Sequence, residues 1–264
     1  MHGFLGPNGA GKTTTMRLLM DYLRPDHGTM EVLGHSPRDI RQLRPQIGYV
    51  PGDLALPGNL TGRQYLQESA RAHGTNHDTM NHLAKVLDAQ LDLKIRELSK
   101  GNRQKIALID GMQHRPRLLI LDEPTDGLDP ILRDRVRGLL RKHAKNGGTV
   151  FLSSHVVHEI QSICDSVSIL VEGRLRMQAK IGELLAQEPT IISARLNDPR
   201  SVTRDLHDAG AKSIMHRTGE IRCEVRGEMV APLQALLAHG ATHLRIHEPD
   251  LEELFLRLYA GESK

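Results

Sequence analysis

The sequence contains few of the residues that mark disulfide-rich, membrane-spanning or zinc-binding proteins. Only two of its 264 residues are cysteines, Cys164 and Cys223, and they form no CxxC pair, which argues against a disulfide framework or a zinc site. No apolar run approaches the ~18 to 20 residues that cross a bilayer. We therefore expect a chain that folds on its own hydrophobic core in a reducing cytoplasm. Any membrane role must come through a partner.

The charge pattern gives little support for nucleic-acid binding. The formal net charge is +3, and Lys and Arg are spread along the chain rather than gathered into a tail. Most of the 15 histidines lie singly in polar stretches, which is typical of solvated surface residues rather than metal ligands. The hydrophobic fraction of 39% and the charged fraction of 25% are those of an ordinary globular protein, which excludes a disordered or fibrous chain.

Short apolar runs alternate with helical patterns over the first two thirds of the chain. This alternation predicts an α/β fold with a parallel sheet, because strands buried on both faces appear as continuous apolar runs. We expect a mainly helical insert at about 53–104, with a helix start at Asn59-Leu60-Thr61. The other expected elements are strands at 1–5, 29–33, 118–121, 150–152 and 167–171, and helices at 12–23, 131–144 and 156–164.

The pattern changes after residue 182. Expected elements follow in the order strand, helix, strand, strand, helix, strand, at 191–196, 202–209, 213–215, 221–225, 229–239 and 244–247. This order predicts a small α+β module of the ferredoxin-like type, closed by a helix at 251–259. We place one domain at 1–182 and an accessory domain at 183–264.

A glycine-rich loop lies between the first strand and the first helix. It reads Gly6-Pro7-Asn8-Gly9-Ala10-Gly11-Lys12-Thr13 and satisfies the phosphate-binding (P-loop) pattern. Glycines let backbone N–H groups turn toward phosphate oxygens, and the following helix offers its positive end to the same anion. Lys12 is expected to neutralise the outer phosphates and Thr13 to place a hydroxyl on Mg²⁺. The candidate phosphate-binding residues are Gly6, Asn8, Gly9, Gly11, Lys12, Thr13 and Thr14.

A second motif is an apolar strand that ends in two carboxylates, Asp122 and Glu123. A magnesium nucleotide needs an acidic partner opposite the loop, and hydrolysis needs a base that orients the attacking water. Asp122 is the candidate metal ligand and Glu123 the candidate base. Together with the loop, the pair indicates an enzyme that hydrolyses a nucleoside triphosphate.

At this point the sequence resembles the ATP-binding cassette (ABC) family, in particular single-cassette ATPases of bacterial drug and polysaccharide exporters of the daunorubicin-resistance type. Leu98-Ser99-Lys100-Gly101-Asn102 is similar to the family signature LSGGQ. The segment 124–130 resembles the D-loop, Ser153-Ser154-His155 resembles the switch-histidine segment, and 249–255 resembles the exporter ending. The expected fold is therefore a P-loop NTPase sandwich, a RecA-like core with a helical subdomain.

The resemblance implies ATP hydrolysis by a head-to-tail homodimer. Ser99 and Gly101 would hold the terminal phosphate bound to the other copy, Asp129 would join this nucleotide site, and His155 would contact the γ-phosphate beside Glu123 and Lys12. It further implies a separate membrane permease as partner and a cytoplasmic, peripheral place at the inner face of the membrane. The transported substrate is chosen by the permease and cannot be read from this chain.

The sequence departs from the family in two places. The glutamine of the Q-loop, a magnesium ligand in the family, should fall near Gly52, which has no side chain to offer. Two alternatives stay open: Asp53 replaces the glutamine as ligand, or this ligand is missing. Family members also carry some thirty residues before the loop, with strands and an adenine-stacking aromatic ring. We expect that the start of the sequence has been placed too late and that these strands are missing.

Two alternatives to an exporter ATPase stay open on the sequence. One is a soluble cassette protein acting on ribosomes or DNA, which usually has two cassettes per chain, a coiled-coil insertion or zinc cysteines. The other is a regulatory nucleotide-binding protein without turnover. The C-terminal module has three open roles: to stabilise the dimer, to gate turnover or to cover apolar surface.

Overall fold

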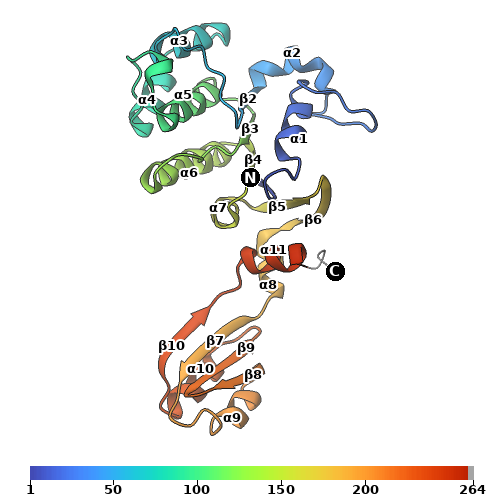
Figure 1. Cartoon of the computed structure of the whole chain (residues 1–264), viewed down its shortest axis with the longest axis vertical. Helices are drawn as coiled ribbons and strands as arrows, with labels where there is room; N and C mark the ends of the chain where they lie inside the picture. Colours follow the sequence, from blue (N-terminus) through green and yellow to red (C-terminus); the bar gives the residue numbers. More distant parts are fainter. Residues whose placement is uncertain (261–264) are drawn as a thin grey trace. The chain divides into compact units, whose positions relative to one another are not determined.

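The computed structural model describes residues 1–260, which divide into two compact units (Figure 1). The first unit is Met1–Ala179 and the second begins at Lys180, at the end of strand β6. The domain boundary predicted from the sequence lies between residues 182 and 183. No helix among the described residues is long and apolar enough to cross a membrane.

A six-stranded sheet forms the centre of the first unit, in the order β2-β3-β4-β1-β5-β6. The pairs β1–β4, β1–β5, β2–β3 and β3–β4 are all parallel, so the expected α/β fold with a parallel sheet is confirmed. The strands are β1 (His2–Leu5), β2 (Ile47–Val50), β3 (Leu118–Asp122), β4 (Thr149–Ser154), β5 (Ser166–Val171) and β6 (Arg174–Lys180).

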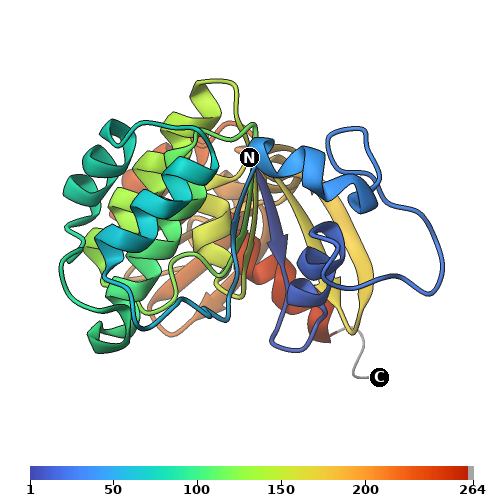
Figure 2. The same ribbon diagram turned by 90° about the horizontal axis from the view of Figure 1, so that it is seen from above.

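Helices cover both faces of this sheet (Figure 2). On one face α1 (Lys12–Leu19) and α2 (Ile40–Leu43) pack on β2 and β3 through a cluster that contains Met16, Leu43, Ile47 and Ile120. On the other face α6 (Pro130–Lys145) packs on β4, and α7 (Val157–Ile163) packs on β1 and β4. Each fully buried aliphatic side chain of this kind contributes about 1.5 to 3 kcal/mol through its removal from water.

The expected helical insert is present as α3 (Gly62–Ala72), α4 (Asp78–Leu87) and the start of α5 (Lys100–Gln113). Thr61 caps α3, as expected from the sequence. Its hydroxyl accepts from the backbone N–H of Gln64, and the side-chain oxygen of Gln64 accepts from the backbone N–H of Thr61, which makes a capping box. Leu83 and Leu87 are buried, with 4% and 0% of their surface exposed. The insert therefore has its own packed face.

One expected strand is absent from the structure, and one expected helix is shorter than predicted. The segment 29–33 is not a strand: only Val32 forms an isolated bridge, with His35, and Leu33 and Gly34 turn the chain with positive φ between them. A strand needs a neighbour to accept its backbone hydrogen bonds, and the local pattern alone cannot supply one. Helix α1 ends at Leu19 rather than near residue 23, since Asp21 takes the left-handed conformation (φ 55°).

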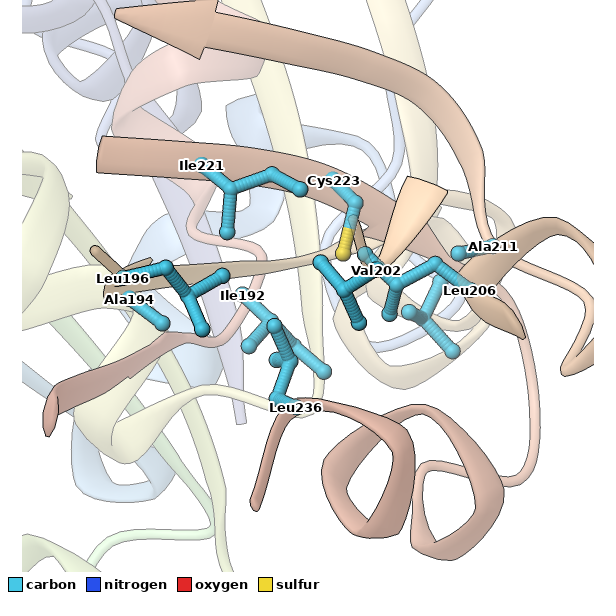
Figure 3. Packing of buried hydrophobic residues seen from close by; sticks show 10 residues of the cluster. Ile192, Ala194, Leu196, Val202, Leu206, Ala211, Ile221, Cys223 and Leu236 are labelled. Atoms are coloured by element: carbon cyan, nitrogen blue, oxygen red, sulfur yellow. The ribbon is translucent and has the colours of Figure 1, made fainter. Parts of the chain in front are cut away.

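The second unit contains a four-stranded antiparallel sheet in the order β10-β7-β9-β8. Its apolar residues, including Ile192, Leu206, Cys223 and Leu236, form one core between the sheet and two helices (Figure 3). The elements are α8 (Ile181–Gln187), β7 (Thr190–Arg195), α9 (Thr203–Asp208), β8 (Lys212–Arg217), β9 (Glu220–Val225), α10 (Val230–Ala238), β10 (Thr242–His247) and α11 (Leu251–Ala260). The ferredoxin-like assignment stays a prediction that rests on this order of elements.

Helix α5 packs closely against the sheet where Gly111 of the helix meets Gly48 of β2. A Cβ atom at Gly48 of β2 would lie 1.9 Å from the carbonyl oxygen of Gly111 in α5 and 2.7 Å from Leu119. We expect Gly48→Ala to lower the free energy of unfolding by about 3 kcal/mol, because the backbone of α5 must move. Gly138→Ala, in open space on α6, should instead raise it by about 0.5 to 1 kcal/mol through helix propensity. Urea unfolding of both variants measures the difference, and equal stability would contradict the close packing.

Both cysteine thiols are expected to be inert in the folded chain. Burial raises the pKa of Cys164 to about 12 and that of Cys223 to about 11. The thiolate is the reactive form, and an unfolded cysteine has a pKa of about 8.5. At pH 8 we therefore expect alkylation by iodoacetamide to be at least about 100-fold slower in the folded chain than in denaturant. Mass spectrometry of each cysteine peptide checks this, and fast labelling of either folded thiol would contradict it.

Candidate functional site

The parallel register brings three strand ends to one edge of the sheet. Leu5 at the end of β1 lies opposite Ser154 of β4, and Asp122 at the end of β3 lies opposite Ser153. The residues that follow β1, β3 and β4 are the glycine-rich loop, Glu123 and His155. Ligand sites in such sheets form at this carboxyl edge.

The glycine-rich loop takes the backbone conformation that its sequence predicts. Gly9 and Gly11 have positive φ values of 81° and 101°, and Gly11 is the residue from which α1 begins. Gly6 has no room for a side chain, because a Cβ atom there would lie 2.5 Å from the carbonyl oxygen of Leu170 in β5. These glycines let the loop turn tightly at the start of α1, where backbone N–H groups attract an anion.

Lys12 is the most enclosed charged group of the loop, with 6% of its surface exposed. Its ammonium donates to the carbonyl oxygens of Gly6 at 2.7 Å and Pro7 at 3.3 Å. It also lies 3.3 Å from Oε1 of Glu123. The ammonium is therefore held inside the loop by oxygen atoms of the kind that a phosphate presents.

Asp122 is completely buried, and both of its carboxylate oxygens accept hydrogen bonds from hydroxyl groups. Thr13 donates to Oδ2 at 2.7 Å, and Ser153 donates to Oδ1 at 2.5 Å. The pKa of Tyr49 is raised to about 12, mainly by burial of its hydroxyl and next by the negative charge of Asp122. Ser153 also accepts from the backbone N–H of Glu123 at 3.1 Å, so one serine positions both acidic residues.

Glu123 connects the loop to the segment after β4. Its Oε2 accepts from Nδ1 of His155 at 2.9 Å, while its Oε1 faces Lys12. The backbone of Glu123 is in the left-handed region with φ 49°, which is unusual for a residue with a side chain and is typical of functional sites. Its carboxylate is 21% exposed and His155 is 46% exposed, so both remain accessible to solvent.

A pocket of about 230 Å³ lies against these groups. It is lined by Pro7, Asn8, Gly9, Gly11, Lys12, Thr13, Thr14 and Glu123. The structure thus brings together nearly all of the expected phosphate-binding residues and the expected base, with Gly6 contributing its carbonyl to Lys12.

Thr13 and Asp122 have the donor chemistry of a magnesium site. A hydroxyl and a carboxylate oxygen lie 2.7 Å apart beside the pocket, and Mg²⁺ prefers such oxygen ligands, one or two from protein with the rest from substrate phosphates and water. The residues present therefore fit the ion.

The expected ligand position after β2 is occupied by a residue without a side chain. A Cβ atom at Gly52 would lie 3.1 Å from Oδ2 of Asp122. A side chain at position 52 would therefore start beside this carboxylate, but glycine offers no ligand atom there. Asp53 is exposed and lines a different depression, together with Tyr49 and Tyr65. The structure therefore does not bring Asp53 into the pocket at the loop.

Ser99, Gly101 and Asp129 lie outside the loop's pocket within one chain. Ser99 caps α5, its hydroxyl accepting from the amide of Asn102 at 3.2 Å, and Asp129 caps α6, accepting from the amide of Leu132 at 2.9 Å. Both side chains are exposed at the starts of helices. Each is accessible to a second molecule.

Two buried side chains make contacts that sequence reasoning did not predict. Glu159 of α7 is 6% exposed and accepts from Thr125 at 2.8 Å and from Ser154 at 3.1 Å, which ties the segments after β3 and β4 together. Asn102 of α5 is 5% exposed and bonds both backbone groups of Gln90 at 2.9 Å. No motif marks Glu159, and the signature-like segment that contains Asn102 does not predict its contact with Gln90.

The chain matches known proteins over most of its length. Residues 1–126 match the family described as ABC transporter. The chain is 34% identical to a Nod factor export ATP-binding protein I of Burkholderia lata, covering 100% of this chain and 89% of that protein. It is 32% identical to the bacitracin transport ATP-binding protein BcrA of Bacillus licheniformis, covering 99% of this chain and 89% of that protein.

Solved structures give the same fold. An ATP-binding subunit of an ABC transporter matches with a TM-score of 0.64 and 28% identity, over 70% of this chain and 81% of that one. The dimeric cassette MJ0796, bound to ADP and Pi in a post-hydrolysis state, matches with a TM-score of 0.63 over 69% of this chain and 85% of its own. At 19% identity this second likeness supports the fold alone, and the expected P-loop NTPase sandwich is confirmed.

The glycine-rich loop, the buried Asp122 and the Glu123–His155 pair occur at one sheet edge, in a chain that matches curated ATP-binding proteins from end to end. The chain belongs to the ABC transporter family, as one of its ATP-binding and ATP-hydrolysing subunits.

Proposed function

We propose that this ATPase powers export through a separate membrane permease and works as a head-to-tail homodimer. The polyphosphate of ATP is held between the Gly6–Thr13 loop of one copy and Ser99 and Gly101 of its twin. The observation that carries this proposal is that Lys12 and Glu123 line the loop's pocket and contact each other, with His155 bonded to Glu123. ATP binding joins the two copies, hydrolysis separates them, and the permease responds to that motion.

ATP binding begins with competition for the ammonium of Lys12. This group contacts two backbone carbonyls and one carboxylate. Phosphate oxygens carry more charge than carbonyl oxygens, so the β- and γ-phosphates draw the ammonium toward themselves. The backbone N–H groups of the loop and the start of α1 bind the same oxygens.

The same competition makes Glu123 available as a base. Its Oε1 faces Lys12 and its Oε2 accepts from His155. When phosphate takes Lys12, Oε1 becomes free to accept a proton from the attacking water, which it aligns with the γ-phosphorus. His155 keeps the other oxygen in place, and we propose that it contacts the γ-phosphate.

Thr13 and Asp122 are the residues that would hold Mg²⁺ beside the phosphates. When bound, the ion supplies positive charge that offsets the negative charge developing on the phosphoryl group. Ser153 keeps Asp122 aligned toward Thr13 and fixes the backbone of Glu123.

The place of the chain in the cell follows from its partner. No described helix can cross a bilayer, whereas the relatives named above are ATP-binding proteins of Nod factor export and bacitracin transport. We infer a cytoplasmic protein that is peripheral on the inner face of the membrane and bound there to its permease. Export is favoured by the names of these relatives.

Replacing the proposed base should separate ATP binding from turnover. In Glu123→Gln the amide keeps the shape of the side chain but cannot take a proton from water. We expect ATP turnover to fall by at least about 100-fold while ATP binding is retained, since general base catalysis contributes about 10² to 10⁴ in rate. Phosphate release and calorimetric titration measure the two quantities. A parent chain that binds ATP with no turnover would instead indicate the regulatory alternative.

Removing the ammonium should weaken nucleotide binding itself. We expect Lys12→Ala to lower the affinity for magnesium-ATP by about 10- to 100-fold, because a charged hydrogen bond contributes about 1.5 to 3 kcal/mol. Lys180→Ala is the matched control, since Lys180 is an exposed lysine whose partner is Glu183. Titration calorimetry of both variants checks the comparison. Unchanged affinity in Lys12→Ala would overturn the proposed binding mode.

A further inference from the structure

The first turn of α5 is in contact with the segment that joins Glu123 to Asp129. The amide of Gln104 donates to the carbonyl oxygen of Pro124 at 3.1 Å in a buried contact. Gly101 approaches so closely that a Cβ atom there would lie 3.1 Å from the carbonyl oxygen of Gly127. The signature turn and the segment 124–127 therefore touch within a single chain.

Lys100 adds a charged contact between the same two segments. Its ammonium donates to Oδ2 of Asp126 at 2.6 Å, the short distance of a charge-assisted hydrogen bond. The methylene carbons of Lys100 lie 3.4 to 3.7 Å from the Cβ position of Gly127, so the stem of the side chain runs over the turn. Gly127 has φ 73°, a left-handed backbone conformation that favours glycine.

This ion pair contributes little to the stability of the fold. The side chains of Lys100 and Asp126 are 66% and 52% exposed, and exposed pairs typically add little stability because water and salt screen them. The pair instead links two exposed segments. Ser99 caps α5 and Gly101 lies in its first turn, whereas Asp129 caps α6 after the segment 124–127.

Asp126 also connects this pair to the catalytic groups electrostatically. The hydrogen bond from Lys100 is the largest cause of its lowered pKa, and the charge of His155 is a smaller one. His155 in turn donates to Glu123, which faces Lys12. Lys100 thus lies at one end of a row of charged and polar side chains, Lys100, Asp126, His155, Glu123 and Lys12, that ends in the phosphate-binding loop.

We propose that Lys100 is a positioning residue that acts through Asp126 of its own chain and not on the nucleotide. Their ion pair holds the segment 124–127 against the first turn of α5. Glu123 and Asp129, at the two ends of that segment, then keep a fixed place relative to Ser99 and Gly101. The inference rests on the proposed function, because Ser99 and Gly101 serve turnover only when they face the nucleotide of the twin.

Turnover measurements on single and double variants test whether Lys100 acts through Asp126. We expect Lys100→Met and Asp126→Asn each to lower kcat by about tenfold, since small displacements of reacting groups cost about that much or more. The double variant should be no slower than either single one, because both remove the same contact. Affinity of the isolated chain for ATP should change less than about twofold. The charge-reversed pair, Lys100→Asp with Asp126→Lys, should recover most of the lost kcat.

Lys105→Met is the matched control on the same helix. Lys105 is exposed and donates to the backbone carbonyl of Asp88 at 2.8 Å, away from the segment 124–127. Its replacement should leave kcat unchanged. Loss of kcat in Lys100→Met with none in Asp126→Asn would overturn the inference, because Lys100 would then act directly on the twin's nucleotide. Additive losses, or no loss in either variant, would overturn it as well.

Hydrogen exchange tests the contact without requiring turnover. Within the segment the amide of Asp126 donates to Glu123 and that of Leu128 donates to Thr125. Both single variants should speed exchange at these amides by at least about threefold, and Lys105→Met should not. If the parent chain fails to hydrolyse ATP but the exchange result holds, the proposed function fails and the Lys100 contact stands. If turnover is normal and exchange is unchanged in both variants, only the inference about Lys100 fails.

Discussion

The parallel register of β1, β3 and β4 is the constraint on which the site depends. Backbone hydrogen bonds place Leu5 opposite Ser154 and Asp122 opposite Ser153. A shift of one residue in the β3–β4 pairing would put the side chains of Asp122 and Ser153 on opposite faces of the sheet. The hydrogen bond between these two side chains would then be lost, together with the contact from Thr13 that holds the loop to β3.

Buried charge explains why the site must be completed by a ligand. Asp122 accepts only from the hydroxyls of Thr13 and Ser153 among its described hydrogen bonds, and neutral donors compensate a buried carboxylate less well than a cation does. Lys12 is likewise enclosed by oxygen atoms of the loop. A magnesium ion at Asp122 and a polyphosphate at Lys12, as proposed above, would bring the complementary charges and would relieve costs that the folded chain otherwise carries.

The sequence was informative where function and structure depend on neighbouring residues. The loop from Gly6 to Thr13, the strand that ends at Asp122 and the cap at Thr61 are local patterns, and each is present in the structure. The expected strand at 29–33 is wrong because pairing is a property of two segments, and the end of α1 is set by the left-handed Asp21. The partners of Glu159 and Asn102 lie far from them in sequence, so no pattern predicts these contacts.

The departures from the family signature become understandable as contacts within the chain. Asn102, which stands where the commonest signature has glutamine, is buried and bonds both backbone groups of Gln90 with its short amide. Lys100, which stands where that signature has glycine, reaches Asp126. Each substitution gives the signature turn a partner in the same chain: one anchors it to the helical insert and the other to the segment after Glu123. In the proposed dimer, a turn fixed on both sides would present Ser99 and Gly101 with less freedom and would lower the entropy cost of binding a nucleotide held by the other copy.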